Sequence, residues 1–326
     1  MVPKAEFRSY YGRPIIKEPV WEVPDVPGYL FFGGLAGASS VLAAGAQLTG
    51  RPGLTRAAKL AALGGISLST VFLIHDLGRP ARFHHMLRVF KLSSPMSVGS
   101  WILSAYGPMA GAAAVTNLAE LLPSGGKSNR PAIAAAKTAA AVIGPPSTAA
   151  AALLGPAVAT YTAVLLCDTA VPAWHAAHRE MPYVFAGSAA SAAGGFGLLA
   201  APRGETGPAR RIAVIGSVVE LAAKKLLEQR LGDQAEPYLT GRANTILRAG
   251  EVLTVGGLAG AVLSRRSRIG SALSGVALLA ASALTRYGIF EAGMASARDP
   301  KYTVVPQRKR QQARQEQEQE QARATG

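Results

Sequence analysis

Residues 26–50 read VPGYLFFGGLAGASSVLAAGAQLTG, a stretch without Asp, Glu, Lys or Arg. A helix needs about 20 mainly apolar residues to cross the roughly 30 Å hydrocarbon core of a bilayer. Charged residues make up only 16% of the 326-residue chain, against about 25% in a soluble domain. The sequence therefore predicts an all-α polytopic integral membrane protein with about eight transmembrane helices in a bundle. Further uncharged stretches are 60–75, 92–119, 138–167, 181–202, 252–264 and 269–285.

The predicted membrane domain covers residues 29–292. It follows an interfacial segment, 1–28, and precedes a polar tail, 293–326, which we expect to be disordered because it has nothing apolar to bury. Gly144-Pro145-Pro146 predicts a helix break, so 132–143 is expected to form a separate helix that lies on the membrane surface or is partly inserted. The predicted spans are 29–48, 57–77, 98–122, 147–167, 182–200, 210–227, 244–264 and 269–290.

The span 210–227 is the weakest of the eight because it carries charges. Glu220 and Lys224 are four residues apart, and so are Lys224 and Glu228. Such i,i+4 pairs neutralise each other on one helix face. The sequence alone gives these residues no further role.

Composition excludes several kinds of redox protein. Cys167 is the only cysteine, so the chain cannot form an internal disulfide, a Cys-ligated iron–sulfur cluster or a multi-Cys zinc site. None of the five histidines lies in the middle of a predicted span, which argues against an internal haem. The net charge of +15 sits in loops and tails, where it suits anionic lipid headgroups better than nucleic acid.

Loop charge bears on orientation in the cell membrane. One set of four short loops carries many cations, and the positive-inside rule places such loops in the cytoplasm. Both termini would then be extracytoplasmic, although cations in the second loop and in the tail argue for the reverse. The short-loop cations are Arg51, Arg56, Lys59, Lys127, Arg130, Arg203, Arg210, Arg211, Arg265, Arg266 and Arg268.

The densest ionisable group is residues 75–101, HDLGRPARFHHMLRVFKLSSPMSVGSW. Gly78 and Pro80 end the second span, and Pro95 precedes the third. About half of this loop is cationic and half is aromatic or apolar. Such a surface suits a docked subunit and the border of a site for a lipid-soluble ligand.

Three motifs carry a family resemblance. The first is His75-Asp76-Leu77-Gly78-Arg79-Pro80, followed by Phe83, Met86-Leu87 and Ser94-Pro95-Met96-Ser97-x-Gly99-x-Trp101. The second is Tyr10-Tyr11-Gly12-x-Pro14-x-Ile16-Lys17 with Trp21, and the third is Tyr161-Thr162-x-x-Leu165-Leu166-x-Asp168-Thr169-x-x-Pro172-x-Trp174. Together they resemble the NrfD/polysulfide-reductase membrane-subunit family over roughly residues 8–290.

The resemblance implies a subunit that binds menaquinone or ubiquinone non-covalently and has no redox metal of its own. It also implies a ferredoxin-like iron–sulfur partner and a catalytic subunit of molybdopterin or comparable type. The sequence leaves two other functions open. One is a membrane anchor that binds no quinone, and the other is an ion or solute transporter.

Quinone chemistry needs hydrogen-bond donors and a proton route, and several side chains qualify. Tyr106 is a candidate donor to a quinone carbonyl, or a phenol bonded between helices. His75 is a second donor or proton carrier, or a helix cap. Asp76 and Arg79 form an ion pair or a relay. Asp168 is a proton acceptor or a cap. The predicted quinone pocket also includes Arg79, Ser94, Trp101 and Trp174.

The remaining candidates fall into two groups. Ionisable side chains inside a membrane are functional candidates by default, so Glu251, Arg286 and Glu291 are predicted to line a proton path. The second-loop cations are predicted to dock the partner, with a solvated charged loop as the alternative. These docking candidates are Arg82, His84, His85, Arg88 and Lys91.

Overall fold

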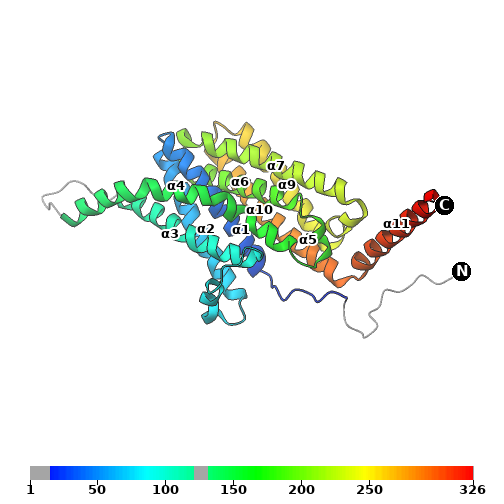
Figure 1. Cartoon of the computed structure of the whole chain (residues 1–326). Helices are drawn as coiled ribbons and strands as arrows, with labels where there is room; N and C mark the ends of the chain where they lie inside the picture. Colours follow the sequence, from blue (N-terminus) through cyan, green and yellow to red (C-terminus); the bar gives the residue numbers. More distant parts are fainter. Residues whose placement is uncertain (1–14, 121–130, 326) are drawn as a thin grey trace.

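The computed structural model describes residues 15–120 and 131–325, and the regular structure in these ranges is entirely helical. This confirms the all-α prediction (Figure 1). The long helices are α1 (Asp25–Leu48), α2 (Pro52–Asp76), α3 (Pro95–Ala119), α4 (Pro131–Cys167), α6 (Met181–Ala200), α7 (Gly207–Leu231), α9 (Gly241–Leu263), α10 (Arg268–Arg298) and α11 (Lys301–Thr325). The short helices are η1 (Pro80–Leu87), α5 (Pro172–Ala176), η2 (Arg203–Glu205), η3 (Gly232–Ala235) and α8 (Glu236–Leu239).

Proline marks where many of these helices begin. It occupies the first or second position of α2, α3, α5, α6, α7 and α8. The first backbone N–H groups of a helix lack an intrahelical acceptor, so proline loses nothing there, and its fixed φ suits the helix. Two further starts carry serine caps: Ser94 accepts a hydrogen bond from the Ser97 N–H, and Ser267 accepts one from the Gly270 N–H.

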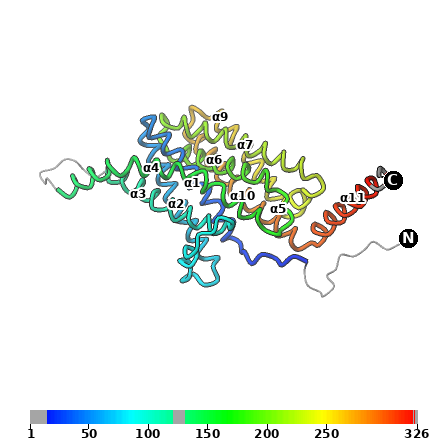
Figure 2. Tube along the Cα trace, viewed as in Figure 1, coloured from blue at the N-terminus to red at the C-terminus, as the bar shows by residue number. Residues whose placement is uncertain are grey.

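The long helices pack as two groups of four. Helices α1 to α4 form the first group, while α6, α7, α9 and α10 form the second. Helix α1 joins the groups, because it packs on α6 and α10 as well as on α2 and α4 (Figure 2). Alternate helix directions bring the start of α1 to the same end of the bundle as the ends of α2, α4, α7 and α10.

Small residues allow a close approach between two helices of the first group. A Cβ on Gly37 of α1 would lie 2.3 Å from the carbonyl oxygen of Gly155 on α4, so glycine is required at this crossing. Membrane helices lack a hydrophobic drive to associate and rely on such close packing.

Within the described residues, six helices are long and apolar enough to span a membrane: α1, α2, α4, α6, α9 and α10. The chain is thus a multi-pass membrane protein. The eight-span prediction additionally requires α3 and α7. Helix α3 packs on α4, and α7 packs on α6. In α7 the charged residues lower the hydropathy. Eight spans therefore remain a prediction.

Helix α4 differs from the sequence prediction. It runs without interruption from Pro131 to Cys167, so 132–143 is not a separate helix. Pro145, Pro146 and Pro156 all lie inside it. Proline removes one backbone donor, but membrane helices tolerate it where neighbouring groups restore the bonding. The sequence prediction treated proline as a helix terminator, which is the rule for water-exposed helices.

The C-terminal region also differs from the predicted disordered tail. Residues 293–298 complete α10, and α11 continues as a second helix that projects from the bundle (Figure 1). Two ion pairs fasten its start: Lys301 to Glu236 at 2.7 Å and Lys309 to Asp233 at 2.8 Å. Beyond them the helix is exposed. Its Gln, Glu, Arg and Ala residues have high intrinsic helix propensity, which a criterion based on apolar burial does not register.

Polar contacts close the end of the bundle where both terminal segments meet. Glu18 pairs with Arg298, bringing the segment before α1 to the end of α10. Arg230 at the end of α7 makes bonds of 2.5 and 2.6 Å to the two carboxylate oxygens of Glu180. The guanidinium holds the pKa of Glu180 below its ordinary value. Several elements distant in sequence are therefore fixed together at this end.

Candidate functional site

The end of the bundle at the start of α1 carries a buried carboxylate beside an exposed imidazole. Asp25 lies in the first turn of α1, where the positive end of the helix dipole favours an anion. Its Oδ2 lies 2.8 Å from Nδ1 of His75, in the last turn of α2. The His75 side chain is 76% exposed and that of Asp25 is 9% exposed. The Asp25–His75 pair thus connects the solvent or headgroup region to the interior of the bundle.

Two tyrosines continue this polar line inward. Tyr29 follows Asp25 by one helical turn, on the same face of α1. Its hydroxyl group is hydrogen-bonded to the hydroxyl of Tyr161 on α4, and both residues are buried. Ser69 donates to the Tyr29 carbonyl oxygen at 3.0 Å. His75, Asp25, Tyr29 and Tyr161, here termed the entry line, bring dissociable protons from α2, α1 and α4 to one end of the bundle.

A glycine on α3 makes room for the last member of the entry line. A Cβ on Gly99 would lie 2.5 Å from Cε2 of Tyr161. Gly99→Ala should therefore displace this ring and destabilise the protein by about 1–3 kcal/mol through overpacking. Thermal unfolding in detergent measures the effect. Gly107→Ala is the matched control on the same helix, because nothing lies within 4 Å of its Cβ position. Equal melting temperatures for the two variants would contradict the prediction.

Two predicted pocket residues are buried and already bonded. Tyr106 is 0% exposed, and its hydroxyl donates to the Ala36 carbonyl at 2.7 Å and bonds to the Ser40 hydroxyl at 2.7 Å. Trp174 is equally buried, donates from Nε1 to the Ile289 carbonyl at 2.8 Å and stacks on Trp21. Tyr106 thus makes the interhelical bond that the sequence left open as its alternative.

Other predicted residues lie around the entrance. Asp76 accepts a hydrogen bond from the Glu22 N–H at 3.3 Å, and within the described residues no ion pair joins it to Arg79. Ser94 caps α3. Asp168 is exposed just beyond α4, and Trp101 is 41% exposed against Phe90.

The loop between α2 and α3 projects from the same end (Figure 1). All five predicted docking residues, Arg82, His84, His85, Arg88 and Lys91, are exposed. Large apolar side chains are exposed among and beside them: Phe83, Val89, Phe90, Leu92 and Met96. This combination, here termed the docking loop, is unusual for a surface left in water, because large exposed apolar patches mark interaction sites.

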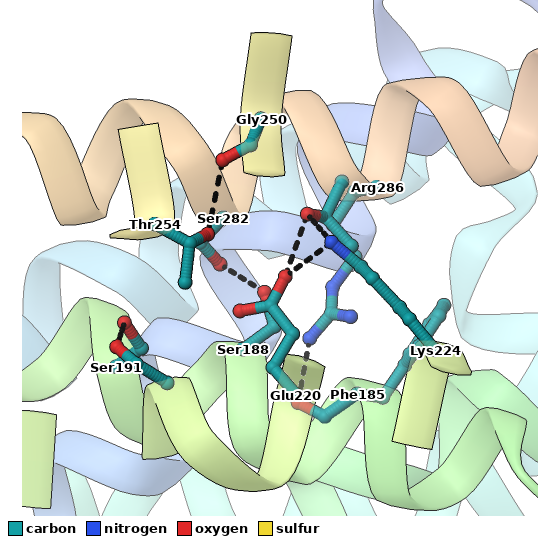
Figure 3. Close-up of polar contacts among 11 residues, drawn as sticks. Phe185, Ser188, Ser191, Glu220, Lys224, Gly250, Thr254, Ser282 and Arg286 are labelled. Carbon is teal, nitrogen blue, oxygen red and sulfur yellow. Dashed lines mark hydrogen bonds and ion pairs between the residues drawn. The ribbon is translucent and has the colours of Figure 1, made fainter. Parts of the chain in front are cut away.

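A second ionisable group lies deep between α7 and α10 (Figure 3). Oε1 of Glu220 accepts hydrogen bonds from Thr285 at 2.7 Å and from Lys224 at 2.8 Å. Lys224 also donates to Thr285 at 2.9 Å. Arg286, the residue after Thr285, is 0% exposed. Its guanidinium donates a hydrogen bond to the Phe185 carbonyl oxygen at 2.8 Å, and its Cζ lies 3.7 Å from the centroid of the Phe185 ring. We term Glu220, Lys224, Thr285 and Arg286 the buried charge cluster.

Parts of this cluster lack protein partners. Oε2 of Glu220 and both Nε and Nη1 of Arg286 are buried without a hydrogen bond in the described residues. Buried polar groups are costly when unsatisfied, and internal water commonly bonds to such atoms. Nearby hydroxyl pairs extend the polar interior: Ser188 bonds to Ser282, and Ser191 to Ser217. The cluster therefore has hydrogen-bonding capacity that no described residue uses.

The structure separates the three residues predicted to line a proton path. Arg286 belongs to the buried charge cluster. Glu291 pairs with Arg242 at 3.7 Å, nearer the end of the bundle, and Glu251 is exposed on the outside of α9.

Sequence reasoning missed six residues that the structure brings into these sites: Asp25, Tyr29, Tyr161, Glu220, Lys224 and Thr285. Asp25 and Tyr29 had a detectable signal, since an ionisable residue lies one turn from a tyrosine at the start of an apolar span. Glu220 and Lys224 were noted as a neutralising pair. Their burial against α10 carried no sequence signal.

These features define a polytopic helical membrane protein with an ionisable entrance, a projecting docking loop and charges in its interior. The model of the polysulphide reductase NrfD family matches residues 15–226, and the chain belongs to that family. No curated protein matches the chain.

Proposed function

We propose that this protein exchanges electrons between a membrane quinone and an extrinsic iron–sulfur subunit. The observation that carries the proposal is the placement of the entry line and the docking loop at one end of the bundle. A quinone bound there would be near both a proton source and the docked partner. Membership of the NrfD family supports this assignment.

The residues at the entrance fit the head group of menaquinone or ubiquinone. His75 offers an exposed imidazole that can donate to a carbonyl, and Asp25 orients that ring from behind. Trp101 and Met96, in the first turns of α3, offer exposed apolar surface at the same end of the bundle. When bound, the quinone supplies two-electron, two-proton redox chemistry. The task of the chain is to hold the head group at His75 and move protons between His75 and Asp25.

Asp25 is also the link to the interior. Protonated or ionised, it can pass a proton between the exposed imidazole and the tyrosine pair one turn deeper. Among the predicted residues, Asp76, Arg79 and Asp168 lie at the rim, where they would set the local charge. Within the membrane domain, the proposed proton-holding group is Glu220 beside Arg286, because these two residues share one buried location. This pair takes the place of the predicted path through Glu251, Arg286 and Glu291.

The docking loop suits a ferredoxin-like iron–sulfur subunit, which would lead to a catalytic subunit of the molybdopterin type. Its cations would pair with carboxylates on the partner while its aromatic side chains are covered. The short-loop charges support an orientation with this end, and both termini, on the extracytoplasmic side of the cell membrane.

Two other functions predict different behaviour. An anchor that binds no quinone would keep the docking loop, but its complex would be insensitive to changes at His75 or Asp25. A transporter would need no extrinsic partner, and its typical broken helices at mid-membrane are not seen in α4, where the sequence had predicted the clearest break.

The docking assignment predicts loss of partners from a charge-reversed loop. Arg82→Glu combined with Arg88→Glu should remove the iron–sulfur and catalytic subunits from the protein purified in mild detergent, because both exposed cations would become repulsive to an acidic partner. Mass spectrometry of the copurifying subunits measures this. Arg265→Glu with Arg266→Glu is the matched control, since these exposed arginines lie at the opposite end of the bundle.

The two purifications separate the alternatives. Recovery of iron–sulfur and catalytic subunits with the unmodified chain and with the control, but not with the loop variant, is the expected result. Recovery of the unmodified chain alone, under conditions that keep other membrane complexes intact, would contradict the proposed function. Retention of both partners by the loop variant would remove the docking assignment.

A further inference from the structure

A cavity at the end of the bundle opposite the docking loop is lined by positive charge. It has a volume of about 570 Å³ and lies between the start of α7 and the end of α9. Its charged lining residues are Arg203, Arg210, Arg211 and Arg265, and no described aspartate or glutamate lines it. Within the described residues, none of these arginines forms an ion pair. This cationic cavity therefore holds charge that the described chain does not neutralise.

Arg210 carries that charge into the protein. Its side chain belongs to a residue that is only 8% exposed. The guanidinium donates hydrogen bonds to the Ala261 carbonyl oxygen and to the Ser271 hydroxyl, which are both neutral acceptors. A buried cation is costly unless a counter-charge accompanies it. An anion in the cationic cavity would supply the counter-charge that these acceptors do not.

The start of α7 adds a second attraction for an anion. Thr206 precedes the helix, but its hydroxyl donates to the Arg203 carbonyl oxygen at 3.0 Å and accepts no hydrogen bond from the first turn of α7. Glu205 is engaged elsewhere, because its Oε2 accepts a hydrogen bond from the Leu54 N–H at 2.8 Å. The first backbone N–H groups of a helix have no intrahelical acceptor and favour an anion.

The rest of the cavity wall is apolar. Val214, Ile215 and Val262 also line it, and Ile215 is 62% exposed. Ile215 lies eight residues after Gly207, about 12 Å along α7 at a rise of 1.5 Å per residue. The cationic cavity thus combines charge at the helix ends with an exposed apolar wall that continues along the side of the bundle.

We propose that the cationic cavity binds the headgroup phosphate of an anionic phospholipid, with an acyl chain along the apolar wall between α7 and α9. Guanidinium groups bind phosphate in a bidentate geometry, and basic pockets between membrane helices bind anionic headgroups. A zwitterionic lipid is disfavoured, because its own cation would face the same arginines. A free phosphate ion is disfavoured because it leaves the apolar wall uncovered.

The positive-inside rule accounts for the sign of these charges but not for their arrangement. That rule counts cations in short loops, and Arg51 and Arg266 contribute to it without lining the cavity. A binding site depends on where each cation lies, so two pairs of short-loop arginines should differ in their effect on lipid binding. The inference does not rest on the proposed quinone function, since the docking loop and the entry line lie at the other end of the bundle.

Native mass spectrometry of the full-length chain, stripped of lipid in mild detergent, tests the proposal. Titration with dioleoylphosphatidylglycerol should show one lipid bound about tenfold more tightly than dioleoylphosphatidylcholine, which has the same acyl chains. Inorganic phosphate has the charge but no acyl chain, so we expect it to bind more weakly than dioleoylphosphatidylglycerol. Equal affinities for the two lipids would overturn the proposal, and phosphate binding as tight as that of dioleoylphosphatidylglycerol would overturn the choice of a lipid.

Two double variants separate the cavity from general loop charge. Arg203→Gln with Arg211→Gln removes two exposed arginines of the cavity and should weaken dioleoylphosphatidylglycerol binding about tenfold. Arg51→Gln with Arg266→Gln is the matched control, because it removes the same short-loop charge from outside the cavity. The control should retain the preference for the anionic lipid. An equal loss of binding in both variants would overturn the proposal.

Discussion

Asp25→Asn should lower quinol-linked turnover about ten- to hundredfold, because general acid–base groups commonly contribute this much or more. Asp25 is the only carboxylate bonded to the exposed His75 imidazole in the described structure, at 2.8 Å. It also lies one turn from the buried tyrosine pair. The amide is nearly the same size but cannot accept or release a proton at neutral pH, so positioning is retained while proton transfer is lost.

Two assays on the purified complex distinguish this loss from misfolding. Activity of the catalytic partner with an artificial electron acceptor should be unchanged, while activity with a soluble quinol analogue should fall. Asp233→Asn is the matched control, because its side chain is 89% exposed and lies outside the entry line. Equal quinol activity for Asp25→Asn and the control, with assembly verified, would remove Asp25 from the proton route.

The sequence predicts most of the architecture because long apolar stretches leave few alternatives. In a bilayer a continuous chain must satisfy its backbone groups within a helix or a closed barrel. Helix starts are equally readable from Pro52, Pro95 and the other early prolines. The prediction failed at Gly144-Pro145-Pro146 because the packed surroundings of α4, and not its local sequence, decide whether a proline interrupts a membrane helix.

The candidate sites are less predictable because they depend on contacts between distant helices. His75 and the docking loop are visible in a single motif. The partner of His75 is not, since Asp25 is fifty residues earlier and reaches it only after α1 packs on α2. Tyr106 is a candidate quinone ligand by sequence, whereas Tyr161 enters only as part of a family motif. Packing separates them, because Tyr106 bonds to the middle of α1 while Tyr161 bonds to its first turns.

Glu220→Gln should destabilise the protein by about 3–5 kcal/mol, the usual effect of removing one partner from a buried ion pair. Glu220 is the carboxylate of the buried charge cluster and binds both Lys224 and Thr285. Without its charge, Lys224 loses its counter-ion in the interior while Arg286 remains buried nearby. Thermal unfolding in detergent should show a melting temperature several degrees below that of the unmodified protein.

Two further variants identify the cause of that loss. Lys225→Gln, at the exposed neighbour of Lys224, should leave the melting temperature unchanged because its side chain is 69% exposed. Adding Lys224→Met to Glu220→Gln should restore part of the stability, since it removes the cation left without a counter-ion. Failure of the second change to recover any stability would mean that Glu220 acts mainly through Thr285 and Arg286. The contribution of the Glu220 charge to stability would then come from its contact with α10, not from the i,i+4 pair that the sequence displays.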